Sequence, residues 1–168
     1  SSPRNLVEQI RTNFIAGGFG GRRCVVCPHR NDLHIQSIRL PRMSDSELAE
    51  ACYWEAAQRF GLERKSMVAD YGRRGEVQQG IEAREELLLV AADLKTIQAR
   101  IEPLLEAGLR PVAVDAPFTS LARFHSLNCR RESDQNRIRC VVEVGSSGAI
   151  IIILRGDQCG FPNGIEIE

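Results

Sequence analysis

The chain has 168 residues, enough for one domain or two small ones with a buried core. Its 22 basic residues equal its 22 acidic residues. This zero net charge argues against a dedicated nucleic-acid binder, which usually has a basic excess. The apolar runs are far shorter than the ~18 residues of a transmembrane helix, so we expect no direct membrane insertion.

Six cysteines are spread along the chain, and the string Cys24-Val25-Val26-Cys27 places two of them close together. We expect this string in a strand, where residues three apart point to opposite faces. There is no second pair at zinc-ligand spacing, and the three histidines form no triad with a nucleophile. The sequence therefore predicts no metal site and no catalytic residues, and reduced thiols favour a cytoplasmic protein.

Near the N-terminus, apolar residues at helical spacing predict a helix over 6–14, ended by the glycines at 17–21. Apolar segments closed by proline predict short strands over 24–27 and 33–40.

A second helix is predicted over 45–60, because Ser44 and Glu47 form a capping box at its start. Its apolar residues span roughly 140° of one face, and Trp54 lies on the opposite, polar face. Large exposed aromatic side chains often mark contacts. Trp54 is therefore our candidate partner-binding residue, with packing against a neighbouring loop of the same chain as the alternative.

In the middle of the chain, we expect strands over 67–71 and 85–92, the second buried on both faces. The polar segment 72–83 contains three glycines and is predicted to be a hairpin loop. Asp93 then caps a helix that Pro103 should kink.

A strand over 111–115 and a helix over 117–126 follow. Strands over 138–144, 149–154 and 159–167 come next, and their short connections predict an antiparallel meander. Four consecutive isoleucines in the middle strand imply that both its faces are covered.

Residues 33–115 have the order strand, helix, strand, strand, helix, strand, which is the ferredoxin-like split motif. The motif predicts a four-stranded antiparallel sheet with both helices on one face. The fold class is therefore α/β (α+β), a class that indicates no function by itself.

Several short segments follow one another in an order that is typical of a known protein family. Pro41-Arg42-Met43-Ser44 precedes the second helix, and Trp54-Glu55-Ala56 lies within it. In this order the chain resembles the PilM family of type IV pilus assembly ATPases, which has a Pro-x-Met-Ser turn and a Trp-Glu-Ala helix. Further matching segments are Asp70-Tyr71, 87–92, 107–111, Val114-Asp115, 121–123 and 142–147.

PilM proteins are cytoplasmic and have an actin-like fold similar to FtsA, with an inserted subdomain. The resemblance implies that 1–32 is part of the first actin-like domain and that 33–115 is the inserted βαββαβ subdomain. Residues 116–168 then supply a return helix and the start of the second domain. The chain has about half the length that such an ATPase needs, so we expect a fragment.

The family binds ATP with magnesium, and Glu143, Gly145, Ser146 and Ser147 resemble its second phosphate loop. They are the candidate cofactor-binding residues. Gly145 permits a close approach of phosphate, but Glu143 replaces the family's Asp, and no segment matches the first phosphate loop. A plain hairpin turn is the alternative, and we expect ATP to bind this chain weakly or not at all.

The resemblance also implies an inner-membrane partner, a PilN-like protein whose N-terminal peptide the family holds. We therefore expect a cytoplasmic assembly or scaffold protein of a type IV pilus or type II secretion-like machine, peripheral to the inner membrane. Self-association stays open. One alternative is an actin-like ATPase active only in a longer chain, and the other is a stand-alone ferredoxin-like regulatory or ligand-binding domain.

Overall fold

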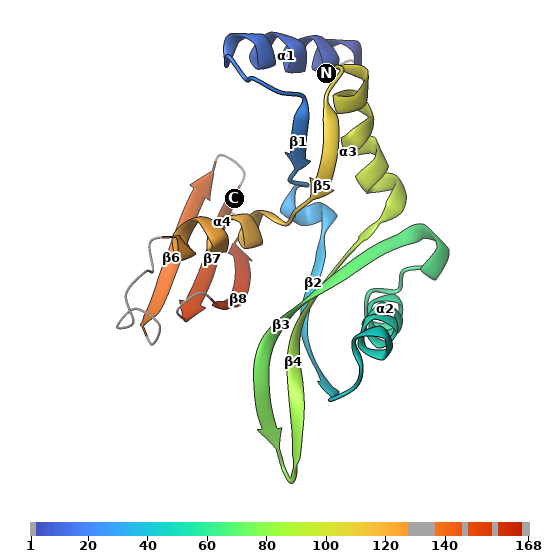
Figure 1. Cartoon of the computed structure of the whole chain (residues 1–168), viewed down its shortest axis with the longest axis vertical. Helices are drawn as coiled ribbons and strands as arrows, with labels where there is room; N and C mark the ends of the chain where they lie inside the picture. Colours follow the sequence, from blue (N-terminus) through green and yellow to red (C-terminus); the bar gives the residue numbers. More distant parts are fainter. Residues whose placement is uncertain (1–2, 128–136, 146–147, 156–157, 166–168) are drawn as a thin grey trace.

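The computed structural model describes residues 3–127, 137–145, 148–155 and 158–165. Within these ranges the chain has the mixed α/β character that was predicted, and its strands form three separate sheets (Figure 1). No helix in the described ranges is long and apolar enough to cross a membrane. The elements are α1 (Pro3–Ala16), β1 (Arg23–Val26), β2 (His34–Pro41), α2 (Asp45–Phe60), β3 (Met67–Gln79), β4 (Glu82–Asp93), α3 (Leu94–Glu106), β5 (Arg110–Val114), α4 (Pro117–Ser126), β6 (Ile138–Gly145), β7 (Gly148–Arg155) and β8 (Gln158–Ile165).

The central sheet has the strand order β2-β4-β3, and α2 covers one of its faces (Figure 1). Leu87 and Leu89 of β4 point to that face, where they and Leu48 of α2 are fully buried. Leu88 points to the opposite face and is buried in a second core with residues of α4 and β7. The prediction that this strand is buried on both faces is therefore confirmed.

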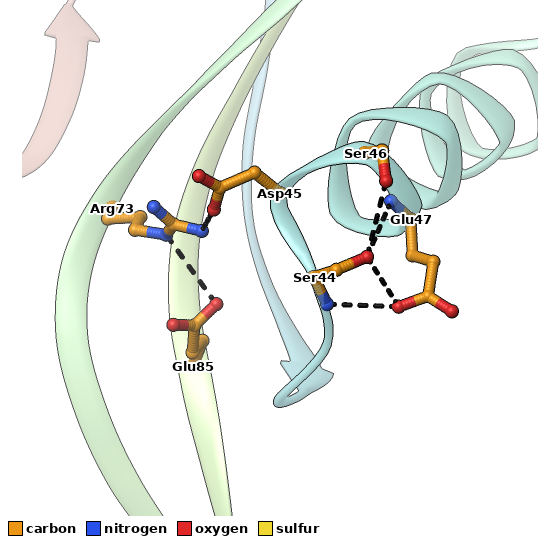
Figure 2. Close-up of polar contacts among 6 residues, drawn as sticks. All are labelled: Ser44, Asp45, Ser46, Glu47, Arg73 and Glu85. Atoms are coloured by element: carbon orange, nitrogen blue, oxygen red, sulfur yellow. Dashed lines mark hydrogen bonds and ion pairs between the residues drawn. The ribbon is translucent and has the colours of Figure 1, made fainter.

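The capping box that begins α2 is also confirmed. The hydroxyl of Ser44 accepts a hydrogen bond from the backbone N–H of Glu47, and the Glu47 carboxylate accepts one from the backbone N–H of Ser44 at 2.9 Å (Figure 2). These bonds satisfy amide groups that have no partner inside the helix. Gly61 ends the helix in the left-handed conformation, with φ of 65°.

The hairpin of β3 and β4 is longer than predicted, because the expected loop over 72–83 continues both strands. The strands stay paired as far as Gln79 and Glu82, so Gly80 and Ile81 alone make the turn. Figure 1 shows the hairpin projecting beyond the rest of the molecule. Its outer part lacks a buried face and therefore lacks the apolar alternation that identifies a strand in a sequence.

The prediction of a four-stranded ferredoxin-like sheet over 33–115 is wrong in its last strand. Strand β5 pairs in parallel with β1, not with the central sheet. The backbone N–H of Arg110 donates to the carbonyl of Arg22 at 2.6 Å, and α3 packs against α1 and β5. A parallel pair needs a long crossover, which the central sheet and its helices supply here. The composition of a short strand does not reveal which sheet edge it joins.

The predicted meander is confirmed, since the last sheet has the order β6-β7-β8. Helix α4 packs on it through Phe118 and Ala122, which share a core with the fully buried Ile152. Ile153 points the other way and is 43% exposed. The expectation that both faces of the isoleucine strand are covered is therefore wrong for this residue. The assignment of 1–32, 33–115 and 116–168 to parts of larger domains stays a prediction.

Candidate functional site

A cavity of about 350 Å³ lies between the central sheet and the junction of β5 with α4, and we name it the groove. Its floor is the face of β3 and β4 that points away from α2. Its other wall comes from the end of β5, the start of α4 and Ile97 of α3. Three parts of the chain that are distant in sequence therefore meet around one cavity.

Strand alternation makes the floor largely apolar. Leu88 and Val90 of β4 point into the groove, because they alternate with residues that pack on α2. On β3 the facing positions are Val68, Asp70 and Gly72. A Cβ atom at Gly72 would meet no atom within 4 Å. The missing side chain at this position therefore leaves the floor open to a ligand.

Asp115, which follows β5, organises the opposite wall. Its carboxylate accepts hydrogen bonds from the hydroxyl groups of Thr119 at 2.5 Å and Ser120 at 2.7 Å, and it forms an ion pair with Arg123. Its side chain is only 18% exposed. Both carboxylate oxygens are thus engaged by the first turns of α4, so Asp115 holds that helix at the end of β5.

Asp70 is the second carboxylate of the groove, and its surroundings differ. It is exposed, and its Oδ1 accepts a hydrogen bond from the backbone N–H of Tyr71 at 2.8 Å. Within the described ranges it forms no ion pair. The groove therefore combines an apolar floor with one neutralised carboxylate and one carboxylate that can receive a cation.

The predicted nucleotide residues lie elsewhere. Glu143 and Gly145 are exposed near the end of β6, where they pair with Ile150 and Gly148 of β7. Neither lines the groove. Ser146 and Ser147 fall outside the described residues. In the part of the chain that the structure describes, no group of three or more His, Cys, Asp or Glu could hold a metal ion, and nucleotide binding stays a prediction.

Trp54 is exposed on the outer side of α2, as the sequence indicated, with 54% of its surface accessible. The guanidinium of Arg64, in the short 3-10 helix Arg64–Ser66, lies 4.0 Å from the centre of its ring. The Trp54 ring is therefore covered in part by its own chain. Because α2 and the groove lie on opposite faces of the central sheet, Trp54 belongs to a separate surface.

Sequence reasoning missed the groove, although it matched Asp70-Tyr71 and Val114-Asp115 to family segments. The signal for Asp70 was a charged residue at an inward position of a strand that is otherwise apolar on that face. The signal for Asp115 was weaker, because its role depends on the turn that begins α4. Neither pattern reveals that the two residues face one cavity.

The fold has close counterparts among solved structures. One is a chain of the "PilM-PilN type IV pilus biogenesis complex", with a TM-score of 0.84 and 23% identity, which matches 100% of this chain and 49% of that one. Another is the cytoplasmic domain of EpsL, an inner membrane component of the type II secretion system of Vibrio cholerae, with a TM-score of 0.59 and 14% identity. That match covers 95% of this chain and 56% of the EpsL domain.

The resemblance to PilM found in the sequence is thus confirmed at the level of the fold. The chain spans about half the length of these two solved structures. No protein-family model and no curated protein matches the sequence.

Proposed function

We propose that this chain is part of a cytoplasmic assembly protein of a type IV pilus or type II secretion-like machine. In this role it recruits a PilN-like inner-membrane partner by holding a short peptide of that partner in the groove. The partner would keep the chain at the cytoplasmic face of the inner membrane. The fold shared with the PilM–PilN complex supports the type of machine.

The groove is the observation that carries the peptide-binding role. Its volume of about 350 Å³ suits a few side chains of an extended segment. Its floor is apolar apart from Asp70, and Asp115, Thr119 and Arg123 add polar groups on the opposite wall. Apolar pockets with a few polar groups are the usual form of a peptide or small-ligand site.

Gly72 provides a sharp test, because a side chain there would enter the groove without striking the protein. We expect Gly72→Val to weaken binding of the N-terminal cytoplasmic peptide of a PilN-like protein from the same genome by tenfold or more, an effect of about 1.4 kcal/mol. Fluorescence anisotropy with a labelled peptide measures the affinity. Valine also suits a strand, so the fold should persist.

Gln78→Val is the matched control, since Gln78 is an exposed residue of the same strand outside the groove. It should leave the peptide affinity unchanged. Equal effects of the two variants, or an absence of saturable binding to the unaltered chain, would contradict the proposal. Thermal unfolding of both variants checks that any loss of binding does not come from a loss of folding.

A further inference from the structure

The end of α1 and the turn after it expose two large apolar side chains. Ile15, in the last turn of the helix, is 77% exposed, and Phe19, which lies between two pairs of glycines, is 66% exposed. The Phe19 ring stacks on Phe14 with 5.8 Å between the ring centroids. Gly17 makes room for this ring, since a Cβ atom there would lie 2.4 Å from it. The turn therefore presents an aromatic ring to solvent.

Three arginines lie close to this turn. Arg22 and Arg23 follow Phe19 within four residues, so their Cα atoms are at most about 14 Å from that of Phe19. Arg110 is the register partner of Arg23 at the start of β5. All three are exposed and form no ion pair within the described ranges. Figure 1 shows α1 at one end of the molecule, beside the starts of β1 and β5.

The acidic residues near this end only partly offset the three arginines. Glu8 is already paired with Arg11 at 2.8 Å. Glu106, the carboxylate closest to Arg110 in the sequence, is exposed at the end of α3, and Glu102 lies one helical turn further away. A positive excess therefore remains beside the exposed ring, although the whole chain has no net charge.

An anionic lipid bilayer matches this combination of groups. Aromatic rings are favoured at the level of the lipid headgroups, and exposed arginines are attracted to anionic lipids. Single-stranded nucleic acid also binds to aromatic rings beside basic groups. However, Ile15 provides no ring on which a base could stack, whereas an aliphatic side chain contributes to binding at a lipid surface.

We propose that this part of the molecule, the membrane-contact end formed by Ile15, Phe19, Arg22, Arg23 and Arg110, binds the surface of an anionic bilayer directly. The two apolar side chains enter the headgroup region, and the arginines pair with lipid phosphates. No segment crosses the bilayer. The contact goes beyond the proposed function, in which the partner keeps the chain at the membrane, and it does not use the groove.

Co-sedimentation with lipid vesicles tests the proposal. Vesicles of phosphatidylcholine alone are compared with vesicles that also contain 30% phosphatidylglycerol. We expect the unaltered chain to partition about tenfold more strongly onto the anionic vesicles, and we expect this preference to shrink in 0.5 M salt. Glycerophosphate at 10 mM should not release the chain, because a single headgroup does not replace a surface.

The arginines are tested by the double variant Arg22→Gln with Arg23→Gln, which should lower partitioning onto anionic vesicles about tenfold. The matched control is Arg59→Gln with Lys65→Gln, which removes the same charge from exposed positions in α2 and in the short helix that follows it. This control should partition like the unaltered chain.

Phe19→Ala tests the apolar contact and should lower partitioning about fivefold. Phe124→Ala is its control, because Phe124 is 64% exposed on α4, and it should have no effect. Thermal unfolding of each variant checks that the fold persists.

Three outcomes would overturn the proposal. The first is equal partitioning of the unaltered chain onto the two types of vesicle, and the second is an equal loss in a variant and its control. The third is release by glycerophosphate, which would indicate a site for a single anion. Binding of a labelled 20-nucleotide single-stranded DNA without any binding to vesicles would assign this end to nucleic acid instead. The groove peptide should bind all these variants equally, so failure here leaves the proposed function standing.

Discussion

The guanidinium of Arg64 lies 4.0 Å from the centre of the Trp54 ring, and it stacks there at the outer surface of α2. The short 3-10 helix that carries Arg64 is itself held to α2, because the hydroxyl of Tyr53 is hydrogen-bonded to the carbonyls of Arg64 at 2.8 Å and Met67 at 2.9 Å. Trp54 therefore has a cationic neighbour over its ring and is still 54% exposed. Rings of this kind are frequent at the centres of protein interfaces.

We therefore expect Trp54→Ala to lower retention of a full-length, detergent-solubilised PilN-like partner by about threefold or more. The free energy of unfolding should change by no more than about 1 kcal/mol, because an exposed cation–π pair contributes little to stability. The affinity for the groove peptide should not change, since Trp54 is outside the groove. Gln58→Ala, on the same exposed side of α2, is the control, and equal retention of the two variants would argue against a partner contact at Trp54.

The capping box at α2 should make stability depend on pH in a predictable direction. Hydrogen bonds from the hydroxyl and backbone N–H of Ser44 lower the pKa of Glu47 below its ordinary value of 4.5. A carboxyl group with a lowered pKa in the folded state stabilises the fold above pH 4.5, and this contribution is lost as the pH falls through the folded-state pKa. Urea unfolding should therefore separate Glu47→Gln from the unaltered chain at pH 7, and the difference should be smaller at pH 3. A constant difference at both pH values would show that the carboxylate charge is not involved.

The core beneath α2 depends on Leu48, which is fully buried against Leu87 and Leu89. Leu48→Ala should lower the free energy of unfolding by about 2–5 kcal/mol, because it removes buried methyl groups and leaves a cavity. Leu105→Ala is the control, since Leu105 is 54% exposed, and should cost less than about 1 kcal/mol. Equal shifts in the urea midpoint for the two variants would contradict this description of the core.

Nucleotide binding is tested most directly by calorimetric titration of the chain with ATP and magnesium. We expect no binding in the micromolar range, because Glu143 and Gly145 are exposed and the sequence has no counterpart of the family's first phosphate loop. A micromolar affinity that Glu143→Ala weakens would instead support the ATPase alternative. Val142→Ala is the control, since Val142 is an exposed neighbour without a polar side chain.

Local sequence signals predicted local structure well, and they failed where distant segments meet. The capping box at Ser44 and the burial of β4 on both faces depend on residues close together in the sequence, so both were predicted. Strand β5 pairs with β1, and the backbone N–H of Arg110 donates to the carbonyl of Arg22. This pairing forms only when the central sheet, which lies between the two strands in the sequence, brings their ends together. The groove was missed for the same reason, because Asp70 and Asp115 meet around one cavity only after that crossover has formed.

Cysteine reactivity tests whether α2 stays packed on the central sheet. Cys52 lies on the face of α2 that packs on the central sheet, where it is 2% exposed. Burial there raises the pKa of its thiol to about 11 from an ordinary value of 9.0. Cys27, just after β1, is exposed. Since the thiolate is the reactive form, iodoacetamide at pH 8.5 should modify Cys27 in the native protein well before Cys52, as peptide mass mapping can measure. In urea the rate at Cys52 should rise toward that of Cys27, whereas fast native modification of Cys52 would mean that α2 does not stay packed on the central sheet.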